Sequence, residues 1–168
     1  MVNSGAVAVT QLSNTVGGVR VPDGFADADR SPGLLLWQVT NRWQAAQRAT
    51  LAPVGLTHVQ FVLLASLTWL ARDAGSGLVM QRDLADHAAT DPAMTSQVLR
   101  ALELKGLVER APHPTDRRAK AIRPTFDGDL ANRAVVLVEG CDAEFFGALG
   151  AGADDLVRAL LTLREAAS

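Results

Sequence analysis

The sequence predicts a mainly α-helical fold that carries one small β-hairpin. Apolar residues make up 48% of the chain, aromatic residues only 5%, and tyrosine is absent, which favours helices over a β-sandwich. After residue 31, most segments repeat apolar residues at three- and four-residue spacing, as amphipathic helices do. Only residues 107–124 combine short β-prone runs with a turn-forming loop. A chain of 168 residues is long enough for one domain with its own core.

Residues 1–31 are predicted to be an N-terminal extension, flexible or draped over a single domain that spans 32–168. The extension is rich in small residues and lacks helical periodicity. It also lacks a basic start followed by a long apolar run, so we expect no signal peptide. No apolar run reaches the roughly 18 residues of a membrane span. A single cysteine, Cys141, excludes an intramolecular disulfide framework and fits a reducing cytoplasm, where we expect the protein to reside.

Two helices are predicted first, over about 33–51 and from Thr57 to about Arg72. Pro53 ends the first helix, because proline disfavours a helical conformation in the residue before it. Thr57 and Gln60 form the T-x-x-Q pattern of a capping box, which marks the start of the second helix. The second helix is apolar nearly all round and is therefore expected to be buried.

A pair of shorter helices is predicted next, over about 81–88 and 92–105. Asp91 is a good N-cap for the second helix of the pair, with proline at its first position. Two short strands follow, over 107–110 and 119–124. We expect Thr125 to cap a long helix that reaches about residue 146, and a last helix over about 154–166.

The order helix, helix, hairpin over 81–124 is that of a winged helix-turn-helix, in which the second helix of the pair enters the major groove of DNA. With the buried helix before it, we expect this part of the domain to span about 57–125. The chain's net charge of −2 argues weakly against this function. However, residues 105–123 hold six basic side chains against two acidic ones, a local net charge of +4. Gln97 can pair with adenine, and a wing arginine suits a narrow minor groove. The predicted DNA-binding residues are Ala93, Met94, Thr95, Ser96, Gln97, Arg100, Arg117, Arg118 and Lys120.

Residues 81–125 resemble the DNA-binding core of the MarR (multiple antibiotic resistance regulator) family. The resemblance rests on DPAMTSQVLRALELKGLVER, on the wing DRRAKAIRPT and on the buried helix LTHVQFVLLASL. It implies a homodimer held by helices at about 33–51 and 126–166, which binds pseudo-palindromic operators. It also implies that Asp116 orders the wing and that Arg118 enters the minor groove. Gln97 departs from the family, many members of which carry arginine there.

The resemblance further implies control by small aromatic or phenolic ligands, and a repressor released by such a ligand is the function we expect. An aromatic carboxylate would stack on indole rings and pair with Arg72 or protonated His58. The candidate pocket residues are Trp37, Trp43, His58 and Arg72. The alternative for the tryptophans is a place in the core or dimer interface. The alternative for the whole chain is a winged-helix module for protein interaction, without ligand control.

Catalytic and metal chemistry find no support in the sequence. There is no G-x-S-x-G, no H-E-x-x-H and no phosphate-binding loop, so we expect neither an enzyme nor a cofactor. Three scattered histidines and one cysteine do not have the spacing of metal ligands. Cys141 is expected to be a small buried apolar residue rather than a redox switch.

Overall fold

The computed structural model describes residues 15–16, 19–20, 29–75, 77–112, 120–125 and 129–166. Its contacts divide the chain into two compact units, Met1–Arg42 and Trp43–Ser168, which are described separately. This division falls inside the first helix. The boundary that the sequence suggested, between an extension over 1–31 and a domain over 32–168, stays a prediction.

The first unit contains a short antiparallel strand pair and the start of helix α1 (Pro32–Leu51). Strand β1 (Thr15–Val16) pairs with β2 (Val19–Arg20), and Val16 lies opposite Val19. The sequence analysis missed this pair, although Gly17-Gly18 between the two strands is a recognised hairpin signal.

Helix α2 (His58–Asp73) follows the 3-10 helix η2 (Ala52–Val54) and begins as predicted. The Thr57 hydroxyl accepts a hydrogen bond from the Gln60 N–H at 3.3 Å, and the Gln60 side chain accepts one from the Thr57 N–H at 3.2 Å. Two donors that the helix leaves open are thereby satisfied, which stabilises its first turn.

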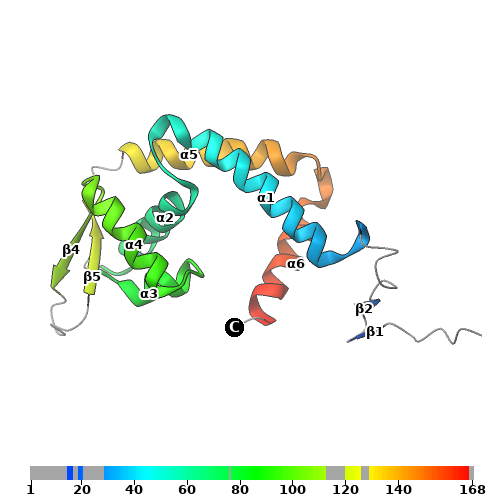
Figure 1. The fold of residues 1–168 in the computed structure, drawn as a ribbon, viewed down its shortest axis with the longest axis horizontal. Helices are drawn as coiled ribbons and strands as arrows, with labels where there is room; N and C mark the ends of the chain where they lie inside the picture. Colours follow the sequence, from blue (N-terminus) through cyan, green and yellow to red (C-terminus); the bar gives the residue numbers. More distant parts are fainter. Residues whose placement is uncertain are drawn as a thin grey trace, which may run out of the picture. The chain divides into compact units, whose positions relative to one another are not determined.

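The winged part of the second unit consists of two helices and three strands (Figure 1). Helices α3 (Gln81–His87) and α4 (Pro92–Leu104) form the predicted helix pair. Strands β4 (Val108–Pro112) and β5 (Lys120–Pro124) form the predicted hairpin. A third strand, β3 (Val79–Met80), pairs with β5 and gives the antiparallel order β3-β5-β4. Two residues are too few to show a sequence alternation, so β3 was not predicted.

The chain ends in α5 (Asp129–Gly147), the 3-10 helix η3 (Gly150–Gly152) and α6 (Ala153–Ala166). The prediction that Thr125 caps α5 is wrong. The Thr125 hydroxyl donates to the Gly106 carbonyl and its N–H to the Leu107 carbonyl, and α5 begins four residues later. Thr125 therefore closes the base of the hairpin.

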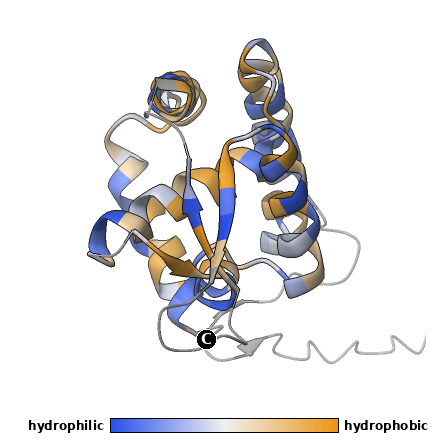
Figure 2. Ribbon diagram, turned by 90° about the vertical axis from the view of Figure 1, so that its left-hand side faces the viewer, coloured by the Kyte–Doolittle hydropathy of each residue, from blue (hydrophilic) through white to orange (hydrophobic). Residues whose placement is uncertain are grey.

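The core of the second unit gathers apolar side chains from α2, α3, α4 and the sheet. Hydrophobic and hydrophilic segments alternate along the helices, as amphipathic packing on a core requires (Figure 2). The largest fully buried apolar side chains are Leu51, Leu63, Leu64, Leu67, Leu84, Leu99, Leu102 and Ile122. Within the described residues, no single helix is long and apolar enough to cross a membrane, although α1 and α2 together, across a sharp bend, meet the length and composition criteria.

Two left-handed turns position α4. At its end, Gly106 has φ +70°, and the N–H groups of Gly106 and Leu107 donate to the carbonyls of Glu103 and Leu102 at 2.9 Å each. This is a Schellman motif. The turn between α3 and α4 has the same hydrogen-bond pattern, but it places Ala89 at φ 50°. A residue with a Cβ is strained in this conformation by about 1–2 kcal/mol.

Ala89→Gly is expected to raise the free energy of unfolding by about 0.5–1 kcal/mol, measured by urea or thermal unfolding. It relieves the left-handed strain, and the greater freedom of glycine in the unfolded chain offsets part of the gain. Gly106→Ala is the matched control with the opposite sign. No atom lies within 4 Å of the position its Cβ would take, so its expected loss of about 1 kcal/mol comes from backbone conformation alone. A destabilising Ala89→Gly would contradict this account of the turn.

Candidate nucleic-acid interface

Helix α4 is two-sided. Thr95, Val98, Leu99 and Leu102 are buried against the core. Ala93, Gln97 and Arg100 are exposed and follow one another at four- and three-residue spacing, so they share the opposite face. Met94 is exposed beside them and Ser96 is half-buried. One face of α4 is thus held by the protein, and the other is free to meet a ligand.

Asp91 caps α4 as predicted. One of its carboxylate oxygens accepts hydrogen bonds from the N–H groups of Ala93 and Met94, both at 2.9 Å. Thr95 is 0% exposed, and its hydroxyl lies 2.8 Å from the Thr90 hydroxyl and 2.8 Å from the Asp91 carbonyl. The prediction that Thr95 contacts DNA is therefore corrected: its hydroxyl closes the turn between α3 and α4. No hydrophobic pattern distinguishes it from the half-buried Ser96, so the sequence could not separate the two.

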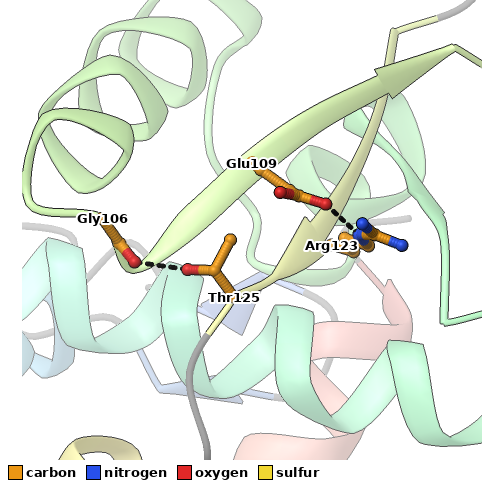
Figure 3. A network of polar contacts seen from close by, with 4 residues as sticks. All are labelled: Gly106, Glu109, Arg123 and Thr125. Carbon is orange, nitrogen blue, oxygen red and sulfur yellow. Dashed lines mark hydrogen bonds and ion pairs between the residues drawn. The ribbon is translucent and has the colours of Figure 1, made fainter.

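The base of the hairpin is fastened to the end of α4 (Figure 3). The figure shows the bond from Thr125 to the Gly106 carbonyl and the ion pair between Arg123 and Glu109. Glu109 and Arg123 face each other in the register of β4 and β5. A second ion pair joins Arg110 of β4 to Glu103 of α4 at 3.1 Å. The strands and α4 consequently form one body.

The structure describes the side chains of three of the six basic residues in 105–123, and all three bind groups of the protein itself. Arg110 and Arg123 are in these ion pairs, and the Lys105 ammonium donates to the Gln60 side chain at 3.1 Å and to the Gly55 carbonyl. Glu109 is already counted in the local charge of +4 and the partners of Lys105 are uncharged, so only the pairing of Arg110 with Glu103 lowers that charge, to about +3. Arg100 of α4 is exposed, and so is Arg82 of α3, which pairs with the neighbouring Asp83 at 3.6 Å.

The tip of the hairpin lies outside the described residues. Asp116, Arg117 and Arg118 fall in this part, and Lys120 is described in β5 by its backbone alone. Their assignment as wing residues that order the hairpin and contact DNA stays a prediction.

Two of the four candidate pocket residues, Trp43 of α1 and His58 at the start of α2, are in contact. The rings of Trp43 and His58 lie 5.0 Å apart in an edge-to-face arrangement. The Trp43 indole N–H donates to Asp142 of α5 at 2.7 Å, and the Gln47 side chain donates to the same oxygen at 2.6 Å. Trp43 thus already serves packing, the alternative that the sequence left open.

His58 is poorly suited to bind an anion. Burial lowers the pKa of its imidazole below 6.5, the nearby Arg48 lowers this pKa further, and Asp142 opposes both. Because the pKa is lowered, His58 is mostly neutral at pH 7, and the sequence-based idea of a protonated His58 is corrected. In the unfolded chain His58 takes up a proton near pH 6.5, whereas in the folded protein it does so only at lower pH. Protonation of His58 therefore lowers the free energy of unfolding as the pH falls below 6.5.

Arg72 lies in the last turn of α2, about 21 Å along the helix from His58 at 1.5 Å per residue. There it lines a cavity of about 230 Å³ between α2 and α5, which we call the α2–α5 cleft. Trp69 lines the same cleft and is 58% exposed, while Trp37, in the first unit, is 68% exposed. The cleft is lined by Phe61, Leu64, Ala65, Thr68, Trp69, Arg72, Ala131, Asn132 and Val135.

The described residues contain no group of metal ligands and one cysteine, Cys141. Among the described residues, no three His, Cys, Asp or Glu side chains are grouped so that they could hold a metal ion. Cys141 of α5 is a free thiol and is half-buried, so the prediction of a fully buried position is wrong.

Comparison with known proteins identifies relatives over most of the chain. Residues 56–120 match the model of the MarR family. An uncharacterised HTH-type transcriptional regulator, YdcH of Bacillus subtilis (strain 168), is 41% identical over 125 residues, which are 74% of this chain and 84% of that protein. The HTH-type transcriptional repressor Rv2887 of Mycobacterium tuberculosis is 35% identical over 129 residues, 76% of this chain and 88% of the repressor.

A solved structure of similar fold is that of BpsR from Bordetella bronchiseptica, with a TM-score of 0.72 and 27% identity. The match covers 86% of this chain and 98% of BpsR. That structure is described as explaining how 6-hydroxynicotinic acid regulates DNA binding by BpsR.

Proposed function

This chain belongs to the MarR family of DNA-binding transcription regulators, and on that premise we propose that it is a homodimeric, cytoplasmic repressor that a small aromatic acid releases from its operator. The observation that carries the proposal is the two-sided α4, whose buried face fixes the helix while Ala93, Gln97 and Arg100 remain exposed. Its exposed groups suit the edges of base pairs in a major groove. The name of the relative Rv2887 supports repression in particular.

A second copy of the chain is the partner we propose for the exposed apolar side chains of α6. Val157, Leu160, Leu161 and Leu163 are all exposed, and a stripe of this kind seldom stays open to water. The first half of α1 likewise exposes Leu34, Leu35, Leu36, Trp37 and Val39. A symmetric dimer covers such faces and doubles the number of recognition helices. Two α4 helices then match a pseudo-palindromic operator with half-sites about one turn apart.

The α2–α5 cleft is the effector site we propose. Its volume of about 230 Å³ is slightly below the usual range of ligand pockets, which favours a single-ring ligand. Trp69 and Phe61 offer ring surfaces, and Arg72 offers a guanidinium that pairs with a carboxylate. Regulation of BpsR by an aromatic acid supports this ligand class. A ligand bound here weakens DNA binding only as far as it prefers the conformation that does not fit the operator.

Gln97→Ala is expected to change base preference, with a loss of about 1–3 kcal/mol at the matched base pair, because it removes a base contact. Arg118→Ala is expected to weaken binding to most sequences and to reduce the slope of log affinity against log salt by about one, because it removes a positive charge from the wing. Fluorescence anisotropy on DNA flanking the gene, at several salt concentrations, measures both. If neither variant differs from the wild type, the assignment of helix and wing is wrong. Salt-independent or absent DNA binding would favour the protein-interaction module.

A panel of salicylate-like acids is expected to quench tryptophan fluorescence and to lower operator affinity about 5- to 150-fold, the range of a typical coupling free energy of 1–3 kcal/mol. Arg72→Gln should weaken both effects, because it removes the cation of the cleft. Arg48→Gln is the matched control: Arg48 is also exposed but does not line the cleft, so both effects should persist. No quenching and no release at millimolar ligand would overturn the aromatic-acid effector and leave the DNA-binding function standing.

A further inference from the structure

We propose that the first turns of α4 select A·T base pairs, and that Met94 is a specificity-determining residue that contacts the methyl group of thymine. The proposal rests on the proposed function, since it assumes that α4 enters a major groove. It goes further by naming the base chemistry that the groove must present.

The exposed surface at the start of α4 is apolar. Ala93 is exposed and Met94 is 38% exposed, and both precede Gln97, which lies one turn later on the same side of the helix. Two apolar groups thus border one carboxamide. An apolar side chain at this position can contact the one apolar group that base pairs present in the major groove, the methyl group of thymine.

Two polar side chains near the start of α4 bond to the protein itself. One oxygen of the Asp91 carboxylate accepts two N–H groups of α4, which fixes this side chain as the cap of the helix. Thr95 is buried with its hydroxyl bonded. The first turn carries no arginine or lysine to bind guanine, and the first basic side chain, Arg100, comes two turns into the helix.

An A·T base pair matches the exposed side chains of Met94 and Gln97. Adenine presents N7 and its amino group to the major groove, a pattern that the Gln97 carboxamide can satisfy with two hydrogen bonds. Thymine of the same or the neighbouring pair presents its C5 methyl group beside them. The unbranched thioether of Met94 adapts to such a methyl group, and its burial removes apolar surface from water.

The test replaces thymine by deoxyuridine, which differs only in lacking that methyl group. An operator is first selected from a random duplex pool by the full-length protein, and each thymine of a half-site is then replaced in turn. We expect A·T pairs under the first turn of α4, and one replacement per half-site that lowers wild-type affinity about fourfold, the value of one buried methyl group. Met94→Ala should bind more weakly and lose this sensitivity.

Leu104→Ala is the matched control, because Leu104 is an apolar residue of the same helix, 90% exposed at its far end. It should keep the wild-type response to deoxyuridine. If the wild type binds a selected operator equally well with and without the methyl groups, or if Met94→Ala keeps the sensitivity, the proposal is overturned and the proposed function stands. If no sequence is enriched from the pool, both are overturned.

Discussion

The left-handed turn at Gly106 is the constraint on which the DNA-binding part of this molecule depends. It ends α4, reverses the chain into β4 and offers the carbonyl to which Thr125 returns from the end of β5. Helix α4 and the hairpin are therefore held at one point, and the ion pair between Arg110 and Glu103 adds a second link. Exposed ion pairs contribute little to stability, so we assign the orientation of the hairpin mainly to the turn and the buried core.

A second junction, at the end of α4, connects this helix through α2 to the proposed effector site. Lys105, at the end of α4, donates to Gln60, whose side chain also caps α2. Helix α2 begins at this junction and ends beside the α2–α5 cleft, where Arg72 and Trp69 lie. A ligand that shifts α2 against α5 thus acts on the element to which α4 is tied. Such a shift changes DNA affinity through the population of two conformations rather than through contact with DNA.

The sequence predicted the parts of the fold that local chemistry decides. The capping box of Thr57 and Gln60 and the cap at Asp91 depend on residues three positions apart or fewer, so their pattern was sufficient. Packing decided the rest. Thr95 lies on the side of α4 that faces the core, where its hydroxyl bonds to the preceding turn, and the Thr125 hydroxyl bonds to Gly106, 19 residues away in the sequence. The cleft joins side chains of α2 and α5 some 60 residues apart, and no periodicity within one helix shows which helices will face each other.

In the proposed complex, the exposed start of α4 lies in the major groove, once per half-site of a dimer. Cys141 is the only cysteine, so Cys141→Ser combined with Ala93→Cys allows an iron–EDTA chelate to be attached at that point alone. Cleavage of bound operator by this chelate should give two clusters of cuts about one turn, roughly 10 base pairs, apart. The same chelate at Leu104→Cys should cut much more weakly. Cuts spread evenly along the DNA, a single cluster, or stronger cleavage from position 104 would contradict the account.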